Sequence, residues 1–182
     1  MRFILSLLLS VVGLFPCQSP ASDPPVLLIL GDSLSAGYGM NREDSWVHLL
    51  DLRLREQGHN YRILNSSISG DTTQGGLSRL PRLLDRYQPA FVIKELGRND
   101  VLRGIYPEVT RRIMTRMVQL SQDACAKFLL AGIMLTHYYG DVYLQRFESL
   151  YADIAGDYYS LVVTFFLEGV VFEEGMLQAD GI

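Results

Sequence analysis

The feature that most limits the fold is an alternation of short apolar runs with longer segments of helical periodicity. The short runs are rich in Val, Ile, Leu and Phe and have the length of buried strands. Strands that alternate with helices through short connections form βαβ units, which build a parallel sheet with helices on both faces. The expected strands are Val26–Leu30, Tyr61–Leu64, Phe91–Leu96, Phe128–Met134 and Leu161–Phe165.

The segments between these runs predict four amphipathic helices. Ser45 is placed to cap the first and Gly58 to end it, Pro89 stops the second, and the third extends from about Pro107 to Gln122. A helix is also expected after the fifth strand, and the sequence ends before one can form. The residues expected to face the sheet are Trp46, Leu49, Leu50, Leu54, Leu77, Leu80, Leu84, Tyr87, Val109, Ile113, Met117, Leu120, Phe147, Leu150, Tyr151, Ile154 and Tyr158.

The N-terminal residues differ in character from the rest of the chain. Arg2 precedes the apolar run Phe3–Phe15, and a small-residue Ser-x-Ala sequence ends at Ala21. This order is typical of a secretory signal peptide, so we expect residues 1–21 to be cleaved, and the protein to be periplasmic or secreted without stable membrane insertion. An uncleaved anchor is the alternative, although the run of thirteen residues is short for a bilayer span. Residues 22–182, in a chain that is 48% hydrophobic and 20% charged, predict one globular domain.

The charge pattern argues against several classes of partner. The chain has a net charge of −4 and no cluster or stripe of basic residues, which speaks against nucleic-acid binding. The histidines and cysteines lack the spacings of a zinc site, and the sequence has no phosphate-binding glycine loop of the P-loop type. The residues therefore give no sign of a nucleic-acid, zinc or P-loop nucleotide site, and we also expect a monomer.

Three polar segments directly follow the first three expected strands. They are Gly31–Ser35, Asn65–Asp71 and Gly97–Asp100. Because the carboxyl ends of parallel strands share one edge of a sheet, we expect Ser33 and Asn99 to lie close together there. Each of these residues taken alone is consistent with an ordinary turn. Their order along the chain is what indicates a functional site.

The same segments resemble the GDSL, or SGNH, family of hydrolases, and in particular its bacterial thioesterase and lysophospholipase branch. The residues that carry the resemblance are Gly31–Met40, Asn65–Leu80 and Glu95–Gly104. The resemblance implies a flavodoxin-like, three-layer α/β/α fold with a five-stranded parallel sheet, here without its last helix. It also implies an enzyme that needs no cofactor.

By this resemblance Ser33 would be the nucleophile that attacks an ester or thioester carbonyl. The backbone N–H groups of Ser33 and Gly70 and the side-chain amide of Asn99 would form the oxyanion hole, the set of donors that stabilises the tetrahedral intermediate. Gly70 suits this role because a residue without a Cβ lets the backbone approach a substrate closely. The nucleophile elbow of the α/β-hydrolases is a poorer match, since Ser35 stands where that motif requires glycine.

The general base of the family is the histidine of an Asp-x-x-His sequence near the C-terminus. Asp180 matches the aspartate, which orients the imidazole, and the sequence stops at Ile182, before the position of the histidine. We therefore expect a truncated copy with weak or no activity. His137 follows the fourth expected strand and would line the substrate site, and a role as substitute base is the alternative.

Arg98 occupies a position where the family carries a small residue. It is interpreted either as a surface arginine or as a substrate-binding residue that narrows the acyl pocket or meets an anionic head group. The function implied by the resemblance is hydrolysis of acyl-CoA, lysophospholipids and aryl esters through an acyl-Ser33 intermediate. The alternatives are a non-catalytic protein that binds acyl ligands and a carbohydrate acetylesterase.

Overall fold

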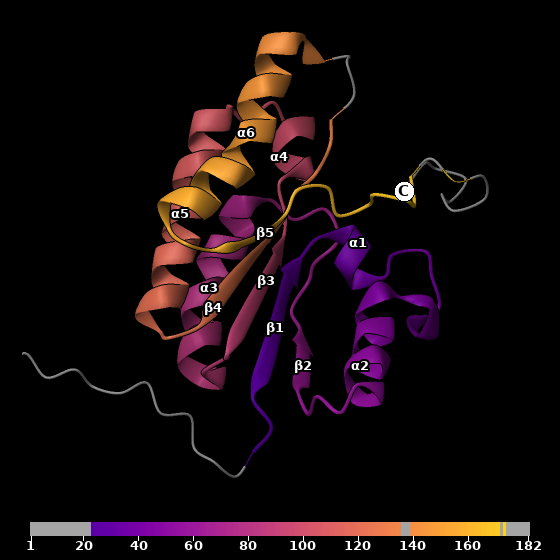
Figure 1. Ribbon diagram of the computed structural model, residues 1–182. Coiled ribbons are helices and arrows are strands. Elements are labelled where there is room, and N and C mark those ends of the chain that lie inside the picture. The colour runs from indigo at the N-terminus through magenta and orange to yellow at the C-terminus, as the bar shows by residue number, and fades with distance from the viewer. Residues whose placement is uncertain (1–22, 136–138, 172, 174–182) are drawn as a thin grey trace, which may run out of the picture.

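The structure of the protein is a computed structural model, which describes residues 23–135, 139–171 and 173. Within these ranges a five-stranded sheet lies between helices on both faces (Figure 1). All five predicted strands and all four predicted helices are present. The elements in chain order are β1 (Val26–Gly31), α1 (Ser33–Ala36), a 3-10 helix (Arg42–Asp44), α2 (Trp46–Glu56), β2 (Arg62–Asn65), α3 (Thr73–Tyr87), β3 (Phe91–Glu95), α4 (Arg98–Leu102), α5 (Pro107–Asp123), β4 (Lys127–Ala131), α6 (Asp141–Asp157) and β5 (Leu161–Val163).

The sheet is parallel throughout, with the strand order β2-β1-β3-β4-β5. Leu28 of β1 lies opposite Leu64 of β2 on one side and Val92 of β3 on the other. The chain leaves β1 toward β2 and leaves β3 toward β4, so the direction of winding reverses between β1 and β3. In flavodoxin-like sheets the crevice outside the carboxyl ends of two such strands is the usual place for a ligand.

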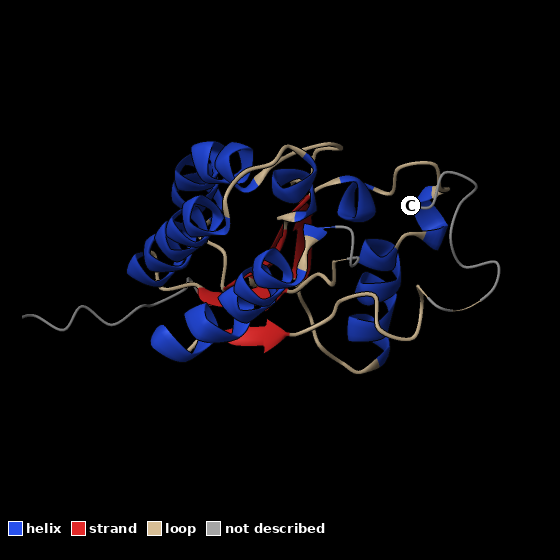
Figure 2. Cartoon of the chain, turned by 90° about the horizontal axis from the view of Figure 1, so that it is seen from above, coloured by secondary structure: helices blue, strands red, loops and turns tan. Residues whose placement is uncertain are grey.

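The two faces of the sheet are covered unequally, as the view from above shows (Figure 2). Helices α3, α5 and α6 pack on one face over Leu28 and Leu30, where most of the buried apolar residues gather. Helix α2 packs on the other face over Leu27 and Ile29 in a smaller cluster. Every residue of β1 is buried, because the strand is covered on both faces.

Some details of the predicted elements are wrong. Leu49 was expected to face the sheet, and its side chain is 52% exposed. Val47 is the fully buried residue near the start of α2, and a position two residues further lies about 200° around the helix, on the solvent side. Strand β4 ends at Ala131 and does not reach Met134. Strand β5 ends at Val163 and does not reach Phe165.

The predicted signal peptide, residues 1–21, lies outside the described residues. Among the helices of the described ranges, none has the length and apolar character needed to cross a membrane. The capping prediction for the first amphipathic helix is confirmed, since the Ser45 hydroxyl accepts a hydrogen bond from the backbone N–H of His48 at 3.3 Å.

Candidate active site

The turn that follows β1 places Ser33 at the carboxyl edge of the sheet. Asp32 caps the short helix α1 by accepting a hydrogen bond from the backbone N–H of Leu34 at 3.1 Å. Gly31 is required before it, because an added Cβ would lie 2.4 Å from the hydroxyl oxygen of Ser35. Ser33 is therefore the first helical residue, and its side chain is only partly buried.

Asn99 is brought to the same place by the turn after β3. Gly97 adopts φ 133°, and an added Cβ there would lie 2.6 Å from the phenolic oxygen of Tyr151, so only glycine fits. Helix α4 then begins, and the Nδ2 of Asn99 donates a hydrogen bond to Oδ2 of Asp32 at 2.9 Å. The predicted approach of Asn99 to the serine turn is thus present as a direct hydrogen bond to the neighbour of Ser33.

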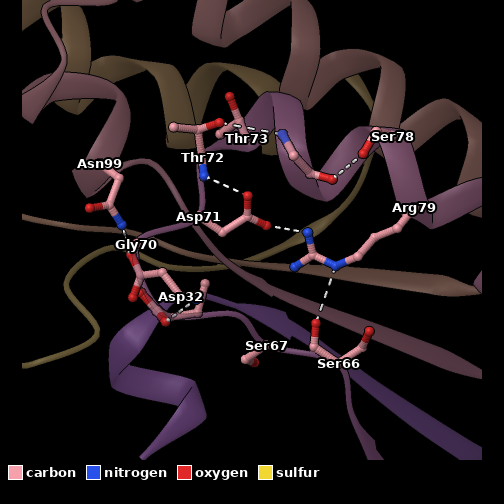
Figure 3. A network of polar contacts seen from close by, with 12 residues as sticks. Asp32, Ser66, Ser67, Gly70, Asp71, Thr72, Thr73, Ser78, Arg79 and Asn99 are labelled. Atoms are coloured by element: carbon pink, nitrogen blue, oxygen red, sulfur yellow. Dashed lines mark hydrogen bonds and ion pairs between the residues drawn. The ribbon is translucent and has the colours of Figure 1, made fainter. Parts of the chain in front are cut away.

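Gly70 reaches this edge on the loop after β2. The backbone N–H of Ile68 donates to the carbonyl of Gly31 at 3.0 Å, which holds the loop along the end of β1. Gly70 has φ 77°, and nothing lies within 4 Å of the position of an added Cβ, so its backbone faces open space. Arg103 donates to the Gly70 carbonyl at 2.8 Å. Figure 3 draws Asn99, Gly70 and Asp32 together.

An ion pair stiffens the loop on which Gly70 lies. Asp71 accepts a hydrogen bond from the backbone N–H of Thr72 at 2.9 Å and pairs with Arg79 of α3. Arg79 in turn donates from Nε to the carbonyl of Ser66 at 3.2 Å (Figure 3). Both charged side chains are less than a fifth exposed, so this pair is more than a screened surface contact.

Asp100 ties the Gly70 loop to the turn that holds Asn99. It is fully buried and accepts hydrogen bonds from both the backbone N–H, at 2.9 Å, and the hydroxyl of Thr73. The hydroxyl of Thr110 on α5 is a third donor at 3.4 Å. A buried carboxylate needs donors of this kind to replace water, and here they connect α3, α4 and α5.

Glu95, at the end of β3, lies beneath the serine turn, the turn after β1 that holds Ser33. It is fully buried and accepts hydrogen bonds from the hydroxyl of Ser35 at 2.7 Å and the backbone N–H of Asp32 at 3.4 Å. Burial raises the pKa of Glu95 to about 8, and the charge of Asp32 is the second cause of this increase. Burial also raises the pKa of Asp32, against the lowering effect of its hydrogen bond from Leu34.

Lys94 points to the opposite face of β3 and is also fully buried. Its Nζ lies 4.3 Å from the centroid of the Tyr151 ring and 3.6 Å from the sulfur of Met114. Burial lowers the pKa of Lys94 to about 7, although the charge of Glu95 acts the other way. Sequence reasoning missed this buried pair, and the signal for it was two adjacent charged residues inside an otherwise apolar predicted strand.

The remaining predicted site residues have different outcomes. Arg98 is the first residue of α4 and is half-buried, and its charge lowers the pKa of Asp32 against the larger effect of burial. Asp180 and His137 lie outside the described residues. Of the other histidines, His48 is half-buried on α2 and His59 is exposed beyond it. In the described ranges no three acidic, histidine or cysteine side chains are grouped so that they could hold a metal ion.

Comparison with known proteins decides the family. The GDSL-like lipase/acylhydrolase family matches residues 29–181. The chain belongs to this family. It is 47% identical to the esterase TesA of Pseudomonas aeruginosa over 156 residues, which cover 86% of this chain and 78% of that protein. It is 41% identical to thioesterase 1/protease 1/lysophospholipase L1 of Escherichia coli K12 over 162 residues, which cover 89% and 76%.

The structure agrees with that assignment. A crystal structure of TesA superposes with a TM-score of 0.83 at 46% identity and covers 86% of this chain and 87% of that chain. The predicted resemblance and the predicted parallel α/β fold are both confirmed. By family, the protein is an acylhydrolase, and the edge of the sheet with Ser33, Gly70 and Asn99 is the candidate site for that chemistry.

Proposed function

We propose that this member of the GDSL-like acylhydrolases cleaves acyl esters and thioesters through an acyl intermediate on Ser33. The observation that most strongly supports this is the hydrogen bond from Asn99 to Asp32, the residue next to Ser33. It holds an amide donor beside a partly accessible hydroxyl at the carboxyl edge of the sheet. The relatives named esterase and thioesterase 1 support the same reaction class.

The reaction begins when the Ser33 oxygen attacks the carbonyl carbon and its proton passes to a base. The negative oxygen of the tetrahedral intermediate is stabilised by the N–H groups of Ser33 and Gly70 and by Asn99. The Asn99 amide has two N–H bonds, and one donates to Asp32, which leaves the other for the oxyanion. One such donor lowers the barrier by roughly 3 kcal/mol.

Breakdown of the intermediate breaks the bond from the carbonyl carbon to the alcohol oxygen or thiol sulfur, and the leaving group takes up the proton. Water then attacks the acyl-serine in the same way and releases the fatty acid. In the family the base is a histidine oriented by an aspartate, and Asp180 is the aspartate we assign to that role. His137 remains the alternative base and a proposed wall of the substrate site.

The substrates we propose are acyl-CoA, lysophospholipids and aryl esters. The relative named thioesterase 1 and lysophospholipase L1 supports the first two. We propose that Arg98 contacts the substrate beside Asn99. The hydrolysis of neutral and anionic esters by Arg98→Gly tests how, because equal effects on both esters would exclude a contact with an anionic head group. We also propose a secreted or periplasmic location, on the signal-like residues 1–21.

Turnover of p-nitrophenyl butyrate by the purified protein tests the proposal. We expect hydrolysis that Ser33→Ala removes and that Ser149→Ala, a matched change at an exposed serine of α6, leaves intact. Equal turnover by both variants would refute Ser33 as nucleophile. Saturable binding of a fatty acid by a wild-type protein that hydrolyses no ester would replace the proposal with the non-catalytic alternative.

A further inference from the structure

One residue, Arg103, is hydrogen-bonded to both of the segments that carry Gly70 and Asn99. Arg103 directly follows α4, and its backbone N–H donates to the carbonyl of Asn99 at 3.1 Å. Its Nη2 donates to the carbonyl of Gly70 at 2.8 Å. The residue whose side chain supplies one proposed oxyanion donor and the residue whose backbone supplies another are therefore joined through a single arginine.

The turn that contains Gly70 is closed on itself and held from two sides. The backbone N–H of Asp71 donates to the carbonyl of Ile68 at 3.1 Å, which closes a four-residue turn around Gly70. The end of β1 holds one side of this turn, through the hydrogen bond from Ile68 to the carbonyl of Gly31. Arg103 holds the other side against α4. A displacement of the Gly70 carbonyl would carry the Gly70 N–H with it, and glycine allows such a displacement more readily than other residues because its backbone is the most permissive.

A second contact between the same segments lies deeper in the protein. Asp100 accepts hydrogen bonds from Thr73, which is the first residue of α3 and lies beyond the turn. Because Asp100 is fully buried, its replacement would disturb folding as well as the site. Arg103 is exposed, so its replacement removes the contact with Gly70 and leaves the core intact.

We propose that Arg103 is a positioning residue that holds the Gly70 N–H at the distance from the Asn99 amide at which both donors reach one oxygen. The inference rests on the proposed esterase function and deepens it, because it names what aligns the oxyanion hole. The negative charge on that oxygen develops only as the tetrahedral intermediate forms. Arg103 therefore affects the rate of the chemical step and leaves the binding of substrate unchanged.

Kinetics on two substrates test this role, namely neutral p-nitrophenyl butyrate and anionic butyryl-CoA. We expect Arg103→Ala to lower kcat about tenfold on both, with KM unchanged, since a charge-assisted hydrogen bond is lost and the alignment of the donors with it. The control is Arg116→Ala, at an exposed arginine of α5, which leaves kcat and KM as in the wild type. A wild-type kcat in Arg103→Ala overturns the inference. So does a higher KM for butyryl-CoA alone, which would mean that Arg103 binds the charged leaving group.

An NMR measurement separates failure of this inference from failure of the esterase function. In protein made with 15N-labelled glycine, the order parameter of the Gly70 amide should fall from about 0.85, the value of a rigid backbone, to below about 0.6 in Arg103→Ala. Gly37 is the internal reference, because its N–H donates to the carbonyl of Ser33 and should stay rigid in both proteins. Loss of order at Gly70 in a protein that hydrolyses no ester would refute the esterase function and support the role of Arg103. Equal order at Gly70 in the wild type and the variant overturns that role, whatever the turnover.

Discussion

Replacement of the buried lysine in β3 is expected to stabilise the protein. Lys94 has no exposed surface, and no carboxylate of the described residues forms an ion pair with it. Its partners are the ring of Tyr151 and the sulfur of Met114. Lys94→Met has a similar length and volume and fills the same space without a charge.

The size of the effect follows from the pKa of Lys94, which burial lowers from 10.5 to about 7. At about 1.4 kcal/mol for each pKa unit, this difference corresponds to roughly 5 kcal/mol against the charged form. The cation–π contact with Tyr151 offsets about 2 kcal/mol of it. We therefore expect Lys94→Met to raise the free energy of unfolding by roughly 3 kcal/mol at pH 6.

The sign of the pH dependence is also defined. Between about pH 7 and pH 10.5 the unfolded chain binds a proton at Lys94 that the folded chain has released, so the contribution of Lys94 to wild-type stability rises with pH in this window. The advantage of Lys94→Met should fall below about 1 kcal/mol by pH 10.

Urea unfolding of both proteins at pH 6 and pH 10 measures these quantities. The control is Lys127→Met, at an exposed lysine of the neighbouring strand β4, which is expected to change the free energy of unfolding by less than about 1 kcal/mol at both pH values. A variant at Lys94 that is less stable than the wild type at pH 6, or whose advantage is the same at pH 10, would refute the reasoning.

Three further predictions concern the site. Asn99→Ala should lower kcat on p-nitrophenyl butyrate by about 10²–10³-fold with little change in KM; an effect on KM alone would contradict its role in the oxyanion hole. The wild type should lose up to roughly 5 kcal/mol of stability between pH 4.5 and about 8, because the unfolded Glu95 carboxyl ionises there and the buried one stays protonated, and Glu95→Gln should remove this loss. Urea midpoints of the wild type that stay the same across this range would count against the prediction. Gly97→Ala should destabilise by more than about 1 kcal/mol in urea, since it strains a φ of 133° and places its Cβ against Tyr151; a variant as stable as wild type would show that the turn relaxes.

Much of the fold could be predicted because its signals are local. A strand such as β1 is covered on both faces, so it reads as an unbroken apolar run, and the glycine after it marks the turn. The helices have one apolar face, which recurs along the sequence every three or four residues. The convergence of Ser33 and Asn99 followed from topology alone, since parallel strands end at the same edge.

The features that the sequence analysis did not predict have a common cause. Whether Leu49 is exposed depends on where α2 lies over the sheet, which the periodicity of the helix does not specify. The burial of Lys94 and Glu95 depends on which helices cover the two faces of β3. The short helices α1 and α4 are too brief to show any periodicity, and they form because Asp32 and Gly97 shape the turns before them.

The sequence by itself determined the parallel α/β architecture and the order of the three site segments, because strand length, helical period and turn residues act over a few neighbouring positions. Tertiary structure alone decided which groups lose water and which meet across distant segments. It joined Asn99 to Asp32, and it buried Glu95 under the serine turn. Burial and charge act through space, and residues far apart in the chain become neighbours only when the sheet and its helices have assembled.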